Sequence, residues 1–265
     1  MPSGVSCPRM TLEPAEHESL DSLIGDWNIF QLRKGHRFST DDLVCAWRAS
    51  LASPGGRRLL DIGSGIGSVG LATLHRMGPY ATLETIEAQE VSYNLAQRTV
   101  RYNGLSDRVT LHQGDLRDAS VLAEGARYDV ITGSPPYIPE GKGVMSPIPQ
   151  RAGARMELRG SVFDYCAAAR RWLAPGGRFT YVMAAQDPRT EEAPVAHELA
   201  VVERWDYVFA ARREPHIATL VCARIEDDPP PRRSGTLVVR GLDGQWTEEY
   251  LEFRREMGSP RRFAR

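Results

Sequence analysis

The amino-acid sequence predicts an α/β protein whose mostly parallel sheet carries helices on both faces. Three observations predict this fold class. Strand-like and helix-like segments alternate from about residue 58 to residue 224, as in parallel sheets with covering helices. A glycine-rich turn joins the first of these strands to a helix at residues 63–70. A long irregular segment follows the fourth strand, which is where doubly wound sheets place their ligands.

The composition is that of an ordinary globular protein. The chain has 265 residues, of which 42% are hydrophobic and 25% charged, and a formal net charge of -1. This balance excludes a uniformly basic surface. No apolar run approaches the roughly 18–20 residues that a membrane span requires, and the N-terminus lacks a signal-peptide pattern. We therefore expect a cytoplasmic protein without a membrane segment.

The four cysteines are too far apart to suggest a metal site. They form no CxxC pair, and no histidine lies near them at the spacing of metal ligands. We expect reduced and mostly buried thiols at Cys7, Cys45, Cys166 and Cys222.

The N-terminal part of the chain falls into two segments. Residues 1–20 lack apolar periodicity and are expected to form a disordered leader. Residues 21–56 are expected to form a hairpin, between Ser22 and Phe38, followed by a helix. Ser39 or Thr40 is placed to cap this helix, and acidic residues in its first turn favour it. The sequence Pro-Gly-Gly at residues 54–56 ends it.

The main domain is expected at residues 57–226. Its predicted helices are 69–76, 91–102, about 157–173 and about 192–201, and residues 134–155 are expected to be irregular. Residues 227–265 are expected to be a linker and a C-terminal extension with a last strand at 236–240 and a last helix at 247–253. Seven strands are expected in the sheet, the final two as an antiparallel pair: 58–62, 82–87, 108–112, 128–132, 178–183, about 203–210 and 217–224.

The glycine-rich turn is the strongest local motif. The segment LLDIGSGIGSVG at residues 59–70 runs from an apolar strand through the turn into a helix. Residues without a Cβ tolerate unusual backbone angles and let a ligand approach the backbone. Glu87 ends the next predicted strand, close to the roughly 20-residue offset at which an acid binds ribose hydroxyls. The two features predict a nucleotide-like cofactor and leave NAD open, with a tight turn that binds nothing as the structural alternative.

Asp115 follows the third predicted strand, in the sequence HQGDL. At such a position an acid, or the backbone beside it, can meet the amino group of an adenine. An isolated aspartate after a strand otherwise forms a turn or caps a helix. Asp115 is therefore a candidate for the adenine end of a cofactor.

A diproline corner follows the fourth predicted strand, in the sequence Ser134-Pro135-Pro136-Tyr137. Two prolines fix φ and remove two donors, so the Ser134 side chain and the Pro135 carbonyl are held as acceptors facing one point. When both N–H groups of a planar amine donate hydrogen bonds to such acceptors, the nitrogen is favoured in a more tetrahedral geometry. In that geometry its lone pair can attack an electrophilic carbon. Tyr137 can stack on the flat substrate. The structural alternative is a corner that ends the strand, with Tyr137 as a half-buried surface aromatic.

Taken together, these motifs resemble the class I S-adenosylmethionine-dependent methyltransferases that act on planar nitrogens, whose corner motif is [DNS]PP[YFW]. Within this class the chain is similar to the bacterial tRNA(Val) adenine-N6-methyltransferases. RFSTD at residues 37–41 resembles their RFxTD, ARME at 154–157 their ARHE, and LAPGGR at 173–178 their LKPGGR. The resemblance covers most of the chain. It implies a Rossmann-like methyltransferase fold, S-adenosyl-L-methionine as methyl donor, S-adenosyl-L-homocysteine as product, and N6 of adenine in tRNA or another nucleic acid as acceptor.

The resemblance also assigns roles to residues. The catalytic residues, which hold the target amine, would be Ser134, Pro135, Pro136 and Tyr137. The cofactor would be closed in by the RFSTD segment, with its methionine part at the glycine turn, its ribose at Glu87 and its adenine at Asp115. The cofactor-binding residues expected on this basis are Phe38, Thr40, Asp41, Asp61, Gly63, Ser64, Gly65, Glu87, Ala88, Gly114, Asp115, Leu116 and Ser134.

Two positions depart from the family pattern and leave the acceptor base open. Ser134 replaces the usual asparagine, as in N4-cytosine methyltransferases, and Met156 replaces the usual histidine. The near-neutral charge argues against a nucleic-acid partner, although arginines near the corner, at residues 151, 155 and 159, offer a local basic patch. The alternatives are a glutamine-amide methyltransferase of the release-factor type, a small-molecule methyltransferase, and a cofactor-binding scaffold without activity. The sequence leaves the oligomeric state open.

Overall fold

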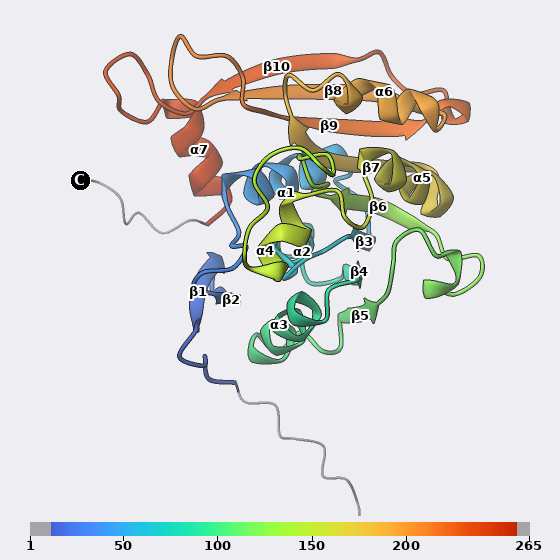
Figure 1. Cartoon of the computed structure of the whole chain (residues 1–265). Helices are drawn as coiled ribbons and strands as arrows, with labels where there is room; N and C mark the ends of the chain where they lie inside the picture. Colours follow the sequence, from blue (N-terminus) through green and yellow to red (C-terminus); the bar gives the residue numbers. More distant parts are fainter. Residues whose placement is uncertain (1–11, 259–265) are drawn as a thin grey trace, which may run out of the picture.

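The computed structural model describes residues 12–258, which form a small hairpin and a large sheet with helices on both faces (Figure 1). The hairpin consists of β1 (Glu18–Ile24) and β2 (Trp27–Leu32). The strands of the large sheet are β3 (Arg58–Ile62), β4 (Thr82–Glu87), β5 (Val109–Gln113), β6 (Tyr128–Gly133), β7 (Leu173–Ala184), β8 (Leu199–Val208), β9 (Ile217–Arg224) and β10 (Arg233–Val238).

The strand order of the large sheet is β10-β8-β9-β7-β6-β3-β4-β5. β9 runs antiparallel to both of its neighbours, and all other pairs are parallel. The predicted fold class is therefore confirmed, with one more strand than the expected seven. The additional strand is β10, which lies in the C-terminal extension and pairs with the edge of β8.

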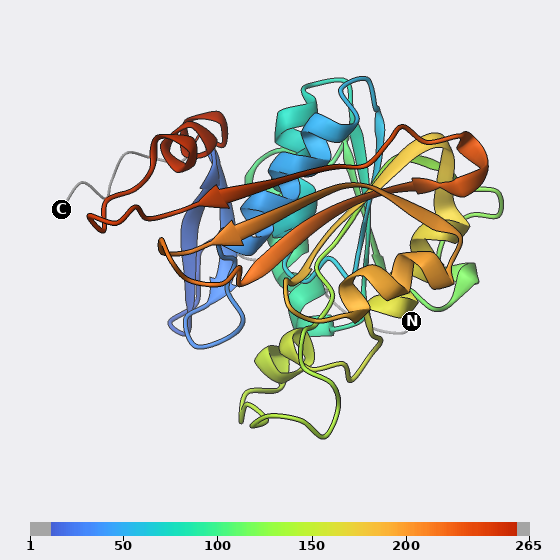
Figure 2. The ribbon, with the colours of Figure 1, turned by 90° about the horizontal axis from the view of Figure 1, so that it is seen from above.

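Two helical layers cover the sheet, and Figure 2 shows them on opposite sides of it. α1 (Thr40–Ala52), α2 (Ser68–Met77) and α3 (Glu90–Tyr102) share one hydrophobic core with the first face. α5 (Val162–Trp172) and α6 (Arg189–Ala196) share a second core with the other face. Near the ends of the sheet lie α4 (Pro149–Arg155), α7 (Glu248–Glu256) and two short 3-10 turns at Ala119–Val121 and Ile225–Asp227.

The N-terminal hairpin is ordered from an earlier residue than the sequence predicts. β1 begins at Glu18, inside the expected leader, because this buried carboxylate pairs with Arg98 of α3 at 2.7 Å. The backbone N–H of Phe30 in β2 donates to the Thr99 hydroxyl at 3.1 Å, which fixes the hairpin on α3. Of the leader expected at residues 1–20, residues 18–20 therefore belong to β1. Residues 1–11 lie outside the described residues.

The start of α1 agrees with the predicted cap. Ser39 is the N-cap, and its backbone N–H donates to the Asp42 side chain at 2.8 Å as part of a capping box. This arrangement satisfies backbone donors that the first helical turn leaves without partners. The helix therefore begins at a defined residue, next to the cavity described below.

Two segments differ from the expected elements. The helix expected at 192–201 ends at residue 196, because Pro194 interrupts its hydrogen bonding and Glu198 has φ +55°. The following residues from Leu199 onward instead pair with β9 as the start of β8. Within the segment expected to be irregular, residues 149–155 form the short helix α4, which begins with a proline at its first position.

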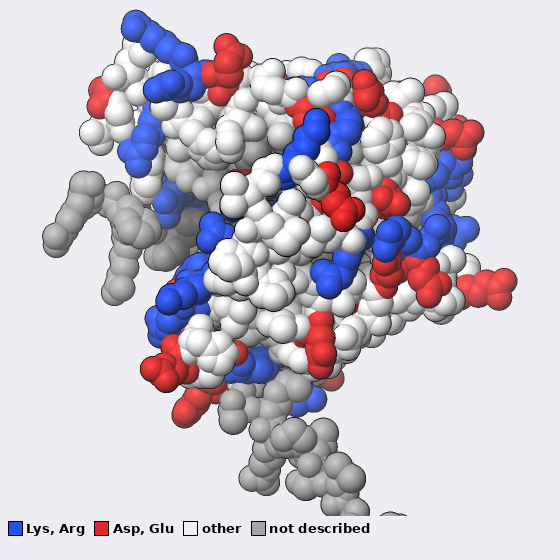
Figure 3. Space-filling model, viewed as in Figure 1, with Lys and Arg blue, Asp and Glu red and all other residues white. Residues whose placement is uncertain are grey.

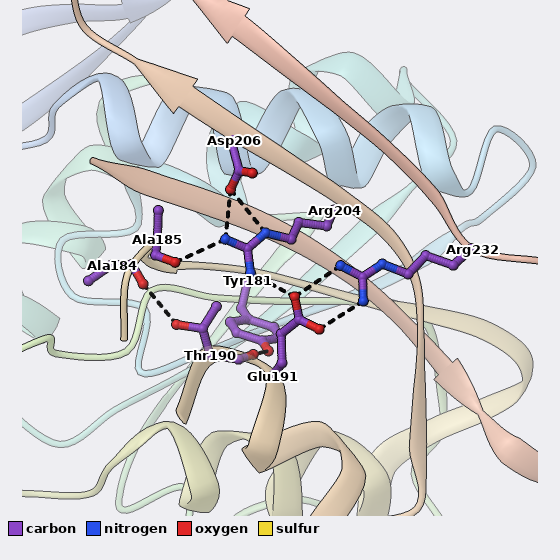
Figure 4. Close-up of polar contacts among 8 residues, drawn as sticks. All are labelled: Tyr181, Ala184, Ala185, Thr190, Glu191, Arg204, Asp206 and Arg232. Carbon is purple, nitrogen blue, oxygen red and sulfur yellow. Dashed lines mark hydrogen bonds and ion pairs between the residues drawn. The ribbon is translucent and has the colours of Figure 1, made fainter. Parts of the chain in front are cut away.

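The C-terminal extension is attached to the sheet by ion pairs. Glu191 of α6 accepts hydrogen bonds from Arg204 of β8 at 2.7 Å and from Arg232, just before β10, at 2.8 and 2.9 Å (Figure 4). Hydrogen bonds from Arg232 and Arg204 lower the pKa of Glu191 to about 2, and the one from Arg232 has the larger effect. The carboxylate of Glu203 in β8 likewise binds Arg233. These contacts hold β10 against the edge of β8, whose backbone groups would otherwise lack partners.

Within residues 12–258 no helix is both long enough and apolar enough to cross a membrane. Three cysteines of this part of the chain, Cys45, Cys166 and Cys222, are buried and form no disulfide. Cys7 lies outside the described residues.

Candidate active site

A cavity of about 670 Å³ lies at the carboxyl ends of the central strands. The glycine turn after β3, the end of β4, the turn after β5 and the corner after β6 all line it. The cavity brings together every residue predicted for the site except Thr40, which is the first residue of α1 and does not line it: Phe38, Asp41, Asp61, Gly63, Ser64, Gly65, Glu87, Ala88, Gly114, Asp115, Leu116, Ser134, Pro135, Pro136 and Tyr137.

The glycine turn requires residues without side chains at two positions. Gly63 has φ +61°, and a Cβ on it would lie 1.9 Å from the Tyr165 hydroxyl oxygen. Gly65 has φ +56°, and a Cβ there would meet no atom within 4 Å. The first glycine is therefore needed for packing. The second leaves open space where a ligand can approach the backbone.

Glu87 connects the ends of two strands from a buried position. One carboxylate oxygen accepts the Gly65 N–H at 2.7 Å and the other accepts the Gln89 N–H at 2.6 Å. Burial raises the pKa of Glu87, and these backbone hydrogen bonds oppose that rise. Each carboxylate oxygen has a second lone pair, so the side chain can accept two further hydrogen bonds from a ligand in the cavity.

Asp61 lies behind the glycine turn and stabilises it. One of its oxygens accepts the Gly70 N–H of α2 at 2.9 Å, and the other accepts the Thr132 hydroxyl of β6 at 2.7 Å. The side chain is 1% exposed, and this burial raises its pKa to about 7. Asp61 therefore holds the beginning of α2 against β6 at the floor of the cavity.

The diproline corner lies in the same cavity as the glycine turn. Pro135 and Pro136 are buried, and the Tyr137 hydroxyl donates to the Asp41 carboxylate at 3.3 Å. This hydrogen bond joins the corner to the first turn of α1. The Ser134 hydroxyl forms no hydrogen bond with another described residue and is partly exposed to the cavity. It is therefore available to accept or donate a hydrogen bond from a substrate.

The carboxylate of Asp115 is occupied by a neighbour. It accepts the Arg117 backbone N–H at 2.9 Å and the Arg117 side chain at 2.9 and 2.6 Å. These hydrogen bonds lower the pKa of Asp115. Residues 114–116 line the cavity at this end.

Sequence patterns gave no indication of Gln150, although it organises the mouth of the cavity. This side chain is 5% exposed, and it bridges the segment before α1 to α3. Its oxygen accepts the His36 backbone N–H at 2.6 Å, and its NH₂ group donates to the Ser92 hydroxyl at 3.2 Å. His36 itself lines the cavity, and burial lowers the pKa of its imidazole. No motif could predict these contacts, because they join residues that only the fold brings together.

The groups around the cavity fit an adenosine ligand that carries an amino acid. Glu87 offers free lone pairs, and the open backbone at Gly65 leaves room for a ligand. The buried Ser64 hydroxyl has no hydrogen-bond partner among the described residues. A buried polar group without a partner is costly, so this hydroxyl is suited to bind a polar ligand atom.

The fold and this site define a class I S-adenosylmethionine-dependent methyltransferase. Residues 48–194 match the family model described as the methyltransferase small domain, which is more than half of the chain. The protein belongs to this family and is an enzyme, which confirms the class indicated by the glycine turn and the diproline corner.

Two relatives of the chain share the name tRNA1(Val) (adenine(37)-N6)-methyltransferase. The protein from Citrobacter koseri is 27% identical over 219 residues, which cover 81% of this chain and 84% of the relative. The protein from Actinobacillus pleuropneumoniae is 24% identical over 202 residues, which cover 74% of this chain and 80% of the relative.

Solved methyltransferase structures share the fold. A predicted O-methyltransferase from Agrobacterium tumefaciens has a TM-score of 0.57 at 14% identity and covers 83% of this chain and 98% of its own. The methyltransferase subunit of a type I restriction-modification system from Streptococcus thermophilus has a TM-score of 0.55 at 15% identity, with coverages of 84% and 53%. At these identities the likeness concerns the fold alone.

Proposed function

We propose that the protein transfers a methyl group from S-adenosylmethionine to a planar nitrogen, N6 of adenine in tRNA. The observation that carries this proposal is the position of the diproline corner and the glycine turn in one cavity. The relatives named for adenine-N6 methylation of tRNA support the acceptor. The segment RFSTD, which the resemblance links to the same activity, borders the cavity with Phe38 and Asp41.

The proposed cofactor contacts use groups lining the cavity that can still accept a hydrogen bond or leave room for a ligand. Both Glu87 oxygens retain a lone pair for the two ribose hydroxyls. The glycine turn would take the methionine part, where Gly65 leaves the backbone open. The backbone beside Asp115 would meet the adenine, because Arg117 already binds the carboxylate. Residues 21–56 would complete the pocket through Phe38 and the helix start at Asp41.

The bound cofactor supplies a methyl group on a positively charged sulfur. The proposed role of the corner is to hold the amine that attacks this methyl. The Ser134 hydroxyl and the Pro135 carbonyl would accept hydrogen bonds from the two N–H groups, which draws the nitrogen lone pair out of conjugation with the ring. Ser134 and Pro135 would hold the amine in this orientation while it gains the methyl group, the cofactor would leave as S-adenosylhomocysteine, and the proton that the amine loses would pass to water. Orientation of this kind contributes on the order of 7–11 kcal/mol.

Cationic side chains at the mouth of the cavity support a nucleic-acid substrate. Arg151 and Arg155 lie one turn apart on α4, and Arg159 follows it; all three are exposed and line the cavity. Their side chains form no hydrogen bond or ion pair with the rest of residues 12–258. Lys34, in the segment between β2 and α1, also lines the cavity. Unpaired cations at a cavity suit a phosphate backbone, and a local patch of this kind is compatible with a net charge of -1.

The test is methyl transfer from radiolabelled S-adenosylmethionine into three substrates offered in parallel. These are an unmodified valine tRNA transcript, the same transcript with guanine at position 37, and a recombinant release factor. The proposal predicts label in the first transcript alone, recovered as N6-methyladenine after nuclease digestion. Label in the release factor would instead establish the glutamine-amide alternative. Absence of label from both transcripts would contradict the proposal.

A further inference from the structure

A loop with an apolar tip projects beside the mouth of the cavity. Residues 139–148, which we call the finger, directly follow the diproline corner and lead into α4. Figure 2 shows the finger and α4 extending together away from the sheet. The base of the finger is fixed, because the Ile138 N–H donates to the Arg155 carbonyl at 3.1 Å and the Ile138 carbonyl accepts the Glu157 N–H at 2.9 Å.

The tip of the finger exposes apolar side chains to solvent. Val144 is 95% exposed and Met145 is 58% exposed. Gly141 and Gly143 before them both have φ +78°, so the chain turns sharply and presents the tip outward. Single exposed apolar residues are common, whereas adjacent ones beside an active site favour a role in contact with a partner. In Figure 3 the centre of this face, where α4 and the finger lie in Figure 1, is largely uncharged, with both basic and acidic residues beside it.

The charges around the finger favour a polyanionic partner. Residues 139–159 contain four cations (one lysine and three arginines) and two acids. One of the acids, Glu157, is neutralised by Arg189 at 2.7 Å. Lys142 in the finger has no hydrogen bond from its side chain and no ion pair within the described chain. An apolar tip between free cations fits a nucleic-acid strand, because cations bind its phosphates and apolar side chains pack on its bases.

We propose that the finger is a wedge that holds the target base out of its stack. The tip residues Val144 and Met145 would pack on the base next to the target, in the place that the target leaves, while Lys142 binds the adjoining phosphate. A stacked base cannot reach a cavity on the enzyme, and side chains inserted beside it stabilise its extruded position. This inference rests on the proposed function and adds to it the part of the protein that contacts the neighbouring base.

The test combines a finger variant with a reporter of base extrusion. The double variant Val144→Ser, Met145→Ser removes the apolar tip without touching the core. Val195→Ser, 69% exposed on α6, and Leu242→Ser, 74% exposed, are controls that remove exposed apolar side chains outside the finger. A tRNA with 2-aminopurine in place of the target adenine fluoresces more strongly when that base is unstacked. S-adenosylhomocysteine binding by calorimetry verifies that the cofactor pocket is intact.

The wedge predicts a specific pattern of results. The double variant should lose about tenfold or more in kcat/KM for tRNA and should fail to raise the 2-aminopurine fluorescence, whereas each control stays within about twofold. S-adenosylhomocysteine should bind all variants equally. A double variant that raises the fluorescence and methylates tRNA like the wild type would overturn the wedge alone. A wild-type protein that methylates no tRNA would overturn the proposed function and the wedge with it.

Discussion

The side-chain oxygen of Gln150 accepts a hydrogen bond from the backbone N–H of His36 at 2.6 Å, across 114 positions of the sequence. The NH₂ group of the same side chain donates to Ser92 in α3. One buried amide thus joins α4, α3 and the segment before α1, and both α4 and that segment line the cavity. A Cβ on Gly35 would lie 2.6 Å from the Gln150 oxygen, so the close approach requires a glycine there.

Replacement of this amide tests whether the contact shapes the cofactor pocket. Gln150→Ala leaves the His36 N–H and the Ser92 hydroxyl without partners, at a cost of about 1–3 kcal/mol, and frees the segment beside the cavity. We expect the Kd of S-adenosylhomocysteine to rise roughly 5- to 150-fold in calorimetry. Gln97→Ala is the control, because Gln97 binds Tyr93 on α3 outside the cavity. Equal affinities for both variants and the wild type would assign Gln150 a purely structural role.

Glu87 is the residue on which the ribose assignment depends. Glu87→Gln keeps the shape of the side chain but puts an NH₂ group where a carboxylate oxygen accepts a backbone N–H. Loss of a charge-assisted acceptor costs about 1.5–3 kcal/mol, so S-adenosylhomocysteine should bind roughly 10- to 150-fold more weakly. Glu84→Gln, on the same strand but paired with His112, should bind it normally. Normal binding by the Glu87 variant would remove this residue from the cofactor site.

Tyr137 should act on the substrate rather than on the cofactor. Tyr137→Ala removes a stacking surface worth about 1–3 kcal/mol per base, so kcat/KM for tRNA should fall roughly 5- to 150-fold while S-adenosylhomocysteine still binds. Tyr137→Phe keeps the ring and loses the hydrogen bond to Asp41. Its loss should therefore be several times smaller than that of the alanine variant. If the two variants lose the same activity, the hydroxyl and its contact with Asp41 matter instead of stacking. Tyr80→Ala, at an 83% exposed position outside the cavity, serves as the control.

The positions of several strands could be predicted from the sequence, because each strand is marked by the residues within it. The strands at 58–62, 82–87 and 217–224 fall on the predicted residues, since each is a short segment in which β-branched and other apolar residues recur. The grouping of the glycine turn, Glu87 and the diproline corner followed from topology. Carboxyl ends of parallel strands meet at one edge of a sheet, so three motifs that each follow a strand lie around one cavity.

The remaining features depend on contacts between distant residues or on competition between neighbours. Gln150 lies in a segment without periodicity, and its partners His36 and Ser92 are 114 and 58 positions away. Asp115 follows its strand as expected, but Arg117 two residues later binds its carboxylate, which a motif does not reveal. A strand is expected at 236–240, but its place as the eighth strand of the sheet depends on the free edge of β8, which exists only in the folded sheet.

The buried carboxyl of Asp61 makes stability depend on pH in a direction that can be measured. Its pKa is about 7 in the folded protein against an ordinary value of 3.8. Between these values the folded protein holds a proton that the unfolded chain has released, so the free energy of unfolding should fall as the pH rises and level off above about 7. The slope from one such group is roughly 1 kcal/mol per pH unit. Asp42, whose pKa is also about 7, contributes with the same sign.

Asp61→Asn isolates the contribution of this group. The amide can accept the Gly70 N–H and donate to the Thr132 oxygen, but it does not titrate. Urea unfolding between pH 5 and pH 8 should give a flatter dependence on pH for this variant than for the wild type, with the slope due to Asp42 and Glu87 remaining. Asp187→Asn is the control, because hydrogen bonds from Arg189 lower the pKa of Asp187 and the group stays ionised over this range. The Asp187 variant should shift the free energy of unfolding by the same amount at every pH, without changing the slope. If the slope of Asp61→Asn equals that of the wild type, Asp61 is ionised when buried.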